Sequence, residues 1–365
     1  MAAPASFIEA RHPPARDSGA AWLRANLFSS PASGMVTLLL ASLLAWAATA
    51  VFGWGVLHAV WRPDANECQA MRGAGACWGV IAEKGRLILL GRYPAGEGWR
   101  PIAATALLLG LVLASCNRRF WRPALLFAWL AVLAVFLWLM GGGAGLTPVA
   151  TDLWGGLPLT VLLTVASLAL AFPLSIAVAL GRRSAMPALR TLCAAYVEVI
   201  RGVPLISVLF MASFMFPLFL PPGHSPDVLV RVIIGIALFA AAYMAEIVRA
   251  GLQSVERGQL EAAASIGLTG WQAQRKVVLP QALAAVVPAI MNNFISLFKD
   301  TSLVTIVSLY ELTGALSLAL GSDPDWRPFK IEAYLFIAAI YFGFCFAMSR
   351  YSLRVERRLA AGRAR

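Results

Sequence analysis

Four polar residues, Lys299, Asp300, Thr301 and Ser302, follow one another after a long apolar stretch of the sequence. Ionisable groups at membrane depth are costly, and they usually face a cavity or a partner. A small zwitterion needs partners of both charge signs together with hydroxyl groups, and these four residues supply all three. They therefore predict a contact site for such a solute. The alternative is an ion pair that only marks a helix end at the membrane surface.

A second pair of opposite charges, Glu246 and Arg249, lies three residues apart in another apolar stretch. On a helix this spacing places both side chains on one face, where they could pair. Tyr243 would lie on the same helix as Glu246. We expect these three residues to border the same path. The alternatives are that the charged pair marks the end of a membrane helix and that Tyr243 is a packing residue.

The composition requires a membrane environment for most of the chain. Of the 365 residues, 60% are hydrophobic and only 13% are charged. Soluble domains have about 45–50% apolar and about 25% charged residues. A helix of about 20 apolar residues crosses the hydrocarbon core. Eight apolar runs meet or approach this length, at residues 35–58, 101–117, 123–142, 155–181, 192–220, 228–250, 281–298 and 332–350.

These runs predict an all-α polytopic membrane protein with about eight transmembrane helices. Pro204 and Pro217 lie within the fifth run, so this helix is expected to be kinked or broken. Residues 299–320 are apolar enough to enter the membrane, yet charges punctuate them. The sequence leaves open whether they cross, re-enter or lie flat.

Basic residues set the orientation. Cytoplasmic loops are enriched in arginine and lysine, and placing the N-terminus in the cytoplasm puts arginine-bearing segments on that side, around residues 118–122, 182–190, 249–276 and 350–365. The outer loops at residues 141–153 and 221–227 then contain no arginine or lysine. Both termini are predicted to be cytoplasmic. The net charge of +12 is thus a topology signal, and nucleic acid is not an expected partner.

Cys68 and Cys77 are the only cysteines in the first outer loop, residues 59–100. A loop that faces an oxidising compartment can hold a disulfide, so we expect this pair to be bridged. The alternative is two free thiols in an ordinary loop.

The sequence offers no residues for enzyme chemistry. It contains no Gly-Lys dipeptide, and hence no phosphate-binding loop, and no His-Glu-x-x-His or paired Cys-x-x-Cys metal motif. We therefore predict no catalytic residue and no metal site. The functional classes that remain are transporter, channel and membrane scaffold.

The longest internal cytoplasmic segment, residues 251–280, holds two short helical patterns. Glu261 is expected to begin the first, Gly267 to supply a left-handed turn between them, and Pro280 to end the second and open the next membrane span. Such a pair could dock into a cleft of another protein. A DNA-binding helix-turn-helix is disfavoured because membrane spans tether both ends, and a plain loop without a partner is the remaining alternative.

This segment resembles the EAA-x3-G-x9-I-x-LP signature of permease subunits in bacterial ABC importers. The matching residues are Glu261, Ala262, Ala263, Gly267, Val277, Leu279 and Pro280, with valine in place of isoleucine. The resemblance implies that the segment is the coupling helix that fits a groove in a separate ATP-binding subunit. That partner would bind ATP and Mg, and this chain would bind no cofactor.

Other phrases resemble permeases for polar amino acids, among them "IRGVPL" at 200–205 and "LFKDTSL" at 297–303. The resemblance covers about residues 151–352, which would form a five-helix type I permease core with its coupling loop at 251–280. Residues 35–150, with the outer loop 59–100, resemble the three-helix N-terminal extension of general L-amino-acid permeases. Residues 1–34 and 353–365 would be cytoplasmic tails.

The resemblance further implies an importer in the bacterial inner membrane that works by alternating access. Its partners would be a periplasmic amino-acid-binding protein, the ATP-binding subunit, a second and related permease subunit, and the lipid bilayer. An ABC permease for another small polar solute is the first alternative, because the signature is shared across importers. A stand-alone secondary transporter is the second.

Overall fold

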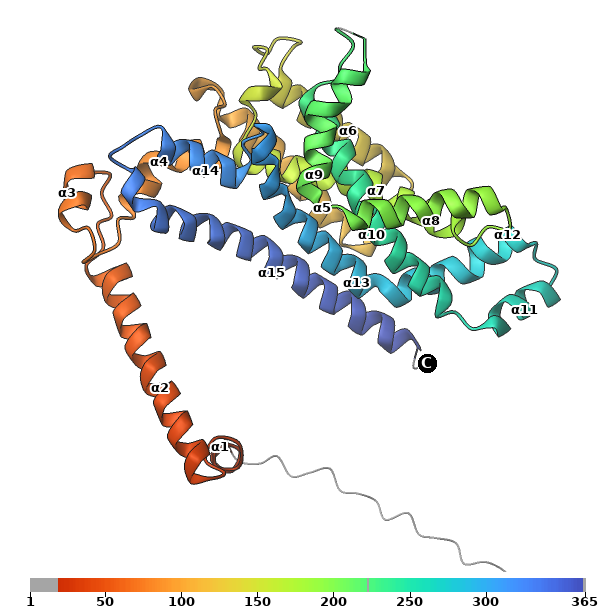
Figure 1. The fold of residues 1–365 in the computed structure, drawn as a ribbon, viewed down its shortest axis with the longest axis horizontal. Coiled ribbons are helices and arrows are strands. Elements are labelled where there is room, and N and C mark those ends of the chain that lie inside the picture. Colours follow the sequence, from red (N-terminus) through yellow and green to blue (C-terminus); the bar gives the residue numbers. More distant parts are fainter. Residues whose placement is uncertain (1–18, 222, 364–365) are drawn as a thin grey trace, which may run out of the picture. The chain divides into compact units, whose positions relative to one another are not determined.

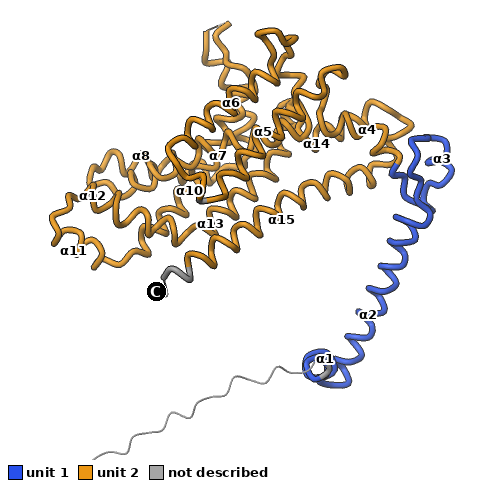
Figure 2. Tube along the Cα trace, turned by 180° about the vertical axis from the view of Figure 1, so that it is seen from behind, with its two compact units in different colours: residues 1–78 blue, residues 79–365 orange. Residues whose placement is uncertain are grey.

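The computed structural model describes residues 19–221 and 223–363, which form helices joined by loops (Figure 1). These residues form no named strand, so the predicted all-α class is confirmed. Contacts within the chain divide it into two compact units, residues 1–78 and residues 79–365 (Figure 2). The second unit contains the last two spans of the predicted extension together with the predicted core.

Seven helical segments of the described chain are long and apolar enough to cross a membrane, and a bent pair makes an eighth. Each coincides with a run predicted from the sequence. The helices of the seven segments are α2 (Pro31–Phe52), α5 (Trp99–Ser115), α6 (Ala124–Gly141), α7 (Gly156–Gly181), α10 (Val228–Gln253), α13 (Leu279–Asp300) and α15 (Lys330–Arg363).

The bent pair confirms the break predicted in the fifth run. Its first part is helix α8 (Pro187–Gly202). Its second part is helix α9 (Leu205–Phe210), which a π-helical turn and a 3-10 helix continue to Phe219, and the two parts meet at 106°. Val203 between them is extended, with φ −110° and ψ 146°. Proline at position 204 disfavours the helical conformation of the residue before it, which explains the position of the break.

Residues 299–320, whose arrangement the sequence left open, belong to three successive helical elements. Helix α13 ends at Asp300, a 3-10 helix runs over Thr301–Val307, and helix α14 occupies Leu312–Gly321. With 10 residues, α14 is too short to span a bilayer. The remaining short α-helices are α1 (Gly19–Leu27), α3 (Ala65–Ala70), α4 (Gly79–Leu90), α11 (Arg257–Ser265) and α12 (Gly270–Ala273).

Helix α10 lies at the centre of the second unit and packs against α7, α13, α8 and α9. Its buried face is rich in alanine, including Ala240, Ala241 and Ala245. Small side chains let helix axes approach closely. At Gly251 a Cβ atom would lie 2.6 Å from the carbonyl oxygen of Ala282 on α13, so only glycine fits there.

One buried carboxylate connects three helices of this unit. Glu311 is fully buried and caps α14 by accepting hydrogen bonds from the backbone N–H groups of Thr313 (2.8 Å) and Gly314 (3.0 Å). Its other oxygen accepts from Thr160 of α7 (3.3 Å) and from the Tyr341 hydroxyl of α15 (2.8 Å). All four donors compensate the cost of burying this group.

Helix α4 is tied to the far end of α14. Lys84 of α4 lies 2.6 Å from Asp323, in the loop after α14. The Lys84 hydrogen bond holds the pKa of Asp323 below its ordinary value. The stabilisation is therefore present above that ordinary value and is lost as the pH falls through the lowered pKa.

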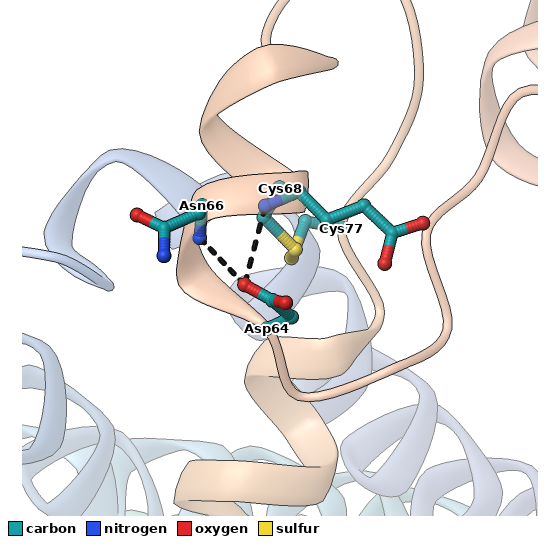
Figure 3. The surroundings of a disulfide bond; sticks show 5 residues. Asp64, Asn66, Cys68 and Cys77 are labelled. Atoms are coloured by element: carbon teal, nitrogen blue, oxygen red, sulfur yellow. Dashed lines mark hydrogen bonds between the residues drawn. A yellow bond between two sulfur atoms is a disulfide. The ribbon is translucent and has the colours of Figure 1, made fainter.

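The first unit contains the predicted bridge between Cys68 and Cys77 (Figure 3). Both cysteines are buried. Asp64 caps α3, its side chain accepting from the N–H of Asn66 at 2.9 Å and its carbonyl accepting from the N–H of Cys68 at 3.1 Å. The bridge thus joins a capped helix to the segment that enters α4.

We predict that Glu311→Ala lowers the free energy of unfolding by about 2–4 kcal/mol, because the N-terminal turn of α14, Thr160 and Tyr341 each lose a buried acceptor. The measurement is the Tm of the detergent-purified protein. Glu356→Ala, at an exposed position of α15, is the matched control. Equal Tm values for the two variants would show that Glu311 does not join these helices.

Candidate functional site

A cavity of about 290 Å³ lies between α10 and α13. Every residue that lines it belongs to one of these two helices. The lining residues are Phe239, Ala240 and Tyr243 of α10, and Asn293, Ser296, Leu297 and Asp300 of α13. The site is therefore a space between two packed helices.

The structure divides the four-residue cluster predicted to contact a solute. Only Asp300 lines the cavity. The Lys299 side chain is exposed, and Thr301 is buried with its hydroxyl donating to the Phe298 carbonyl at 2.8 Å. Ser302 is half-buried outside the cavity lining. Consecutive residues on a helix point about 100° apart, so four in a row cannot share one face.

Two further cavity residues, Asn293 and Ser296, were missed in the sequence. They precede Asp300 on α13 by seven and four residues, the spacing that places side chains on one helix face. This spacing is the sequence signal that could have identified both residues as neighbours of Asp300. The Oδ1 atom of Asn293 is buried and has no hydrogen-bond partner among the described residues.

The cavity thus offers a carboxylate from Asp300, hydroxyl groups from Tyr243 and Ser296, and an amide from Asn293. A carboxylate and an unpaired carbonyl oxygen accept hydrogen bonds, as an ammonium group requires. The hydroxyl and amide groups can also donate. The chemistry suits a small solute that carries an ammonium group beside acceptor oxygens.

An ionic cluster lies one helical turn beyond Tyr243 on α10. The predicted pairing of Glu246 and Arg249 is confirmed, with Arg249 Nε donating to Glu246 Oε1 at 3.0 Å. Arg182, just after α7, donates to Glu246 at 2.5 Å. Arg201 of α8 lies 4.0 Å from Glu246 and 5.3 Å from the ring centre of Tyr243. One carboxylate therefore gathers arginines from the ends of three helices.

Beyond this cluster, α10 leads into the segment predicted to dock a partner. Helix α11 ends near Gly267, whose φ of 79° is the predicted left-handed turn. Its N–H donates to the Ala264 carbonyl at 2.9 Å, and the Leu268 N–H donates to the Ala263 carbonyl at 3.1 Å. These bonds close the end of α11. Thr269 and Gln272 then form a capping box that starts α12.

Two predictions about this segment were wrong. Helix α11 begins at Arg257, so Glu261 lies in its second turn and not at its start. Pro280 does not end the second helix. A π-helical turn, Gln274–Val278, carries α12 into α13, and the Leu279 N–H donates to the Gln274 carbonyl. Proline is tolerated here because it sits in the first turn of α13, where the wider turn rearranges the hydrogen bonds.

The segment presents both apolar and basic side chains outward. Ile266 is 74% exposed and Trp271 is 65% exposed, Arg275 and Lys276 are also exposed, and Ala263 and Ala273 are buried. Of the other signature residues, Glu261, Ala262 and Pro280 are exposed and Leu279 is half-buried. Exposed large apolar side chains on a rigid, capped helix pair are typical of a docking surface.

Comparison with known proteins identifies the kind of molecule that carries this arrangement. Residues 171–361 match the model of the family described as binding-protein-dependent transport system inner membrane component. The chain belongs to this family. It is accordingly a multi-pass inner membrane transport protein. Both the cavity and residues 251–280, which we term the docking segment, lie within the matched residues.

Two relatives match nearly the whole length of this inner membrane component. It is 42% identical to the inner membrane amino-acid ABC transporter permease protein YhdY of Escherichia coli, covering 94% of this chain and 93% of that protein. It is 36% identical to the glutamate/glutamine/aspartate/asparagine transport system permease protein BztC of Rhodobacter capsulatus, covering 93% of each.

Part of the chain is also similar to a solved structure of a transporter. A crystal structure of an amino acid ABC transporter with histidines is 33% identical and superposes with a TM-score of 0.50, covering 56% of this chain and 92% of that chain. The probable glutamine ABC transporter permease protein GlnP of Bacillus subtilis is 34% identical, with 93% of its length covered by 56% of this chain. Shorter relatives thus correspond to only part of this inner membrane component.

We predict that Gly267→Val abolishes most transport while the protein still inserts, because a β-branched residue resists the positive φ that joins α11 to α12. The measurement is binding-protein-dependent uptake, normalised to the amount of protein in the membrane. Gly267→Asn is the control, since asparagine tolerates this conformation and should retain most uptake. Normal uptake by the valine variant would contradict a role for this turn.

Proposed function

We propose that this chain is the permease subunit of an ATP-driven ABC importer that carries polar L-amino acids from periplasm to cytoplasm. The single observation that carries the proposal is the cavity between α10 and α13, the two helices that the docking segment joins. YhdY is an amino-acid permease and BztC is a permease for glutamate, glutamine, aspartate and asparagine, which supports the same solute class.

The proposed partners follow from this function. An ATP-binding subunit would bind ATP and Mg and would dock on the exposed face around Ile266 and Trp271. This chain would contribute no hydrolysis. A periplasmic amino-acid-binding protein would deliver the solute, and a second, related permease subunit would complete the path.

The proposed orientation places both termini and the docking segment in the cytoplasm. Cys68 and Cys77 would then lie in the periplasm, which allows a disulfide. We further propose that residues 35–150 form an extension and that residues 151–352 form the core. The family model matches residues 171–361, and the shorter relatives match little more than half of this chain, which supports that division.

The proposed mechanism is alternating access driven through the docking segment. Closure of the ATP-binding subunits would displace α11, α12 and the π-helical turn together. Because these elements join α10 to α13, their displacement would change the separation of the two helices at the cavity. The Glu246 cluster lies between the cavity and the docking segment, so its ion pairs would close the cytoplasmic end of the path.

In the cavity, Asp300 would bind the ammonium group that all L-amino acids share. Asn293, Ser296 and Tyr243 would contact the carboxylate or polar side chain of the solute. Arg201, which lies over the ring of the cavity-lining Tyr243 and pairs only loosely with Glu246, would offer a cation to a solute carboxylate.

Uptake of labelled glutamate tests the proposal, in cells with and without this gene and against a panel of unlabelled competitors. We expect deletion to abolish uptake and acidic, basic and neutral amino acids all to compete. Competition by one class only would narrow the solute range. Unchanged uptake, with intact partner genes and no redundant system, would contradict the amino-acid assignment and favour another polar solute.

We predict that Asp300→Asn raises the KM for uptake by roughly tenfold or more, because the charged hydrogen bond to the solute ammonium group is lost. The measurement is initial uptake rate against concentration of the loaded binding protein in proteoliposomes. Asp325→Asn, an exposed aspartate in the loop before α15, is the control. If both variants shift KM equally, Asp300 does not contact the solute.

A further inference from the structure

An arginine at the start of α5 is completely buried. The Nε atom of Arg100 donates to the Leu139 carbonyl of α6 at 2.6 Å, and its Nη1 atom donates to the carbonyl oxygen (3.0 Å) and the hydroxyl (3.1 Å) of Thr147. Nη1 also lies 3.6 Å from the Glu97 carboxylate. Burying a guanidinium group is costly unless such partners surround it. Neither the cavity nor the docking segment contains this residue.

Thr147 belongs to residues 142–155, which join α6 to α7 and which we term the α6–α7 strap. Its hydroxyl accepts from Arg100 and donates to the Glu97 carboxylate at 3.0 Å. At Gly142, where φ is 83°, a Cβ atom would lie 2.1 Å from the Thr147 carbonyl oxygen. The first half of the strap is therefore tightly fitted to the start of α5.

The second half of the strap reaches α10. The Thr151 hydroxyl donates to Asp227 Oδ2 at 2.6 Å. Asp227 is the N-cap of α10, and its Oδ1 atom accepts from the Leu229 N–H at 2.7 Å. Between these contacts, Arg92 donates to the Asp152 carbonyl at 2.6 Å. The strap thus connects the proposed extension, residues 35–150, to the first turn of α10.

Helix α10 extends from this contact to the cavity and beyond it. It is one α-helix without proline from Val228 to Gln253. Phe239, its first cavity residue, follows Val228 by about 16 Å of helix. The strap therefore contacts α10 on the side of the cavity opposite to the docking segment. In the proposed orientation this end of α10 faces the periplasm.

We propose that Arg100 is a positioning residue that holds the periplasmic end of α10 through the α6–α7 strap and so keeps the cavity closed on that side. A role in packing α5 against α6 would need only the bond to Leu139. The bonds from Arg100 to Thr147 and from Thr151 to Asp227 carry the restraint on to α10. The proposal rests on the proposed alternating-access mechanism and gives the extension a part in it.

Thiol labelling of the complete transporter in proteoliposomes tests the proposal, with a cysteine at Ser296 and with Cys116, Cys193 and Cys345 replaced. Thr151→Val keeps the shape of the side chain and removes the hydroxyl that reaches Asp227. Without ATP, we expect a membrane-impermeant reagent to label this variant from the periplasmic face roughly threefold faster or more, as loss of one hydrogen bond implies. Thr151→Ser keeps the hydroxyl and should label at the unsubstituted rate.

Arg100→Lys tests the other end of the strap, because lysine cannot reproduce the forked contacts of the guanidinium group. We expect it to accelerate labelling as Thr151→Val does. The double variant should label no faster than the faster single variant, since both changes release the same strap. Equal rates for Thr151→Val and Thr151→Ser, an unchanged rate for Arg100→Lys, or multiplied effects in the double variant would overturn the proposal.

Amide hydrogen exchange separates this proposal from the proposed function. In the detergent-purified complex, residues 228–235 should exchange faster in Arg100→Lys and in Thr151→Val than in Thr151→Ser. Exchange requires no solute, so this result would support the restraint on α10 even for a transporter of another solute. Equal exchange in all three variants would show that the strap does not hold α10, whichever solute is carried.

Discussion

The close packing of α10 against α13 is the constraint on which the rest of the structure depends. At Gly251 and Ala282 the two helices approach so closely that a Cβ atom would overlap the facing carbonyl group. The docking segment joins the same ends of the same helices. Further along, the cavity lies between the same two helices. In the proposed mechanism, this tight contact would let a small displacement of the docking segment alter the cavity.

Two carboxylates of the second unit illustrate different uses of charge. Glu311 is fully buried and receives four hydrogen bonds from α7, α14 and α15, so it fixes three elements. Glu246 is partly exposed and pairs with arginines that arise from separate helices. Ion pairs near water are weak individually and can exchange partners at low cost. A cluster of this kind suits a boundary that must open and close, whereas the Glu311 network suits a fixed joint.

Much of the fold could be predicted from the sequence because a bilayer restricts what the chain can do. Apolar length alone located all eight spans, and Pro204 located the break in the fifth. Gly267 was predicted correctly because a positive φ between helices is a local requirement. The start of α11 was misplaced because Glu261 fits a helix start and a helix interior equally well. The continuity through Pro280 could not be foreseen, since it depends on a π-helical turn.

The candidate site was predicted only in part. Tyr243 and Asp300 line the cavity, whereas Lys299, Thr301 and Ser302, which are adjacent to Asp300 in the sequence, do not line it. Asn293 and Ser296 share the face of Asp300, and their helical spacing carried that information. The capping role of Glu311 depends on contacts with residues far away in sequence, which no local pattern reports.

In the proposed mechanism, ATP binding changes the side of the membrane from which the α10–α13 cavity is reached. A cysteine at Ser296, with Cys116, Cys193 and Cys345 replaced, would report this directly in proteoliposomes of the complete transporter. We expect a membrane-impermeant thiol reagent to label this cysteine from the cytoplasmic face without ATP and from the periplasmic face with ATP trapped. Labelling from one face only, unchanged by ATP in a complex that still transports, would contradict the account.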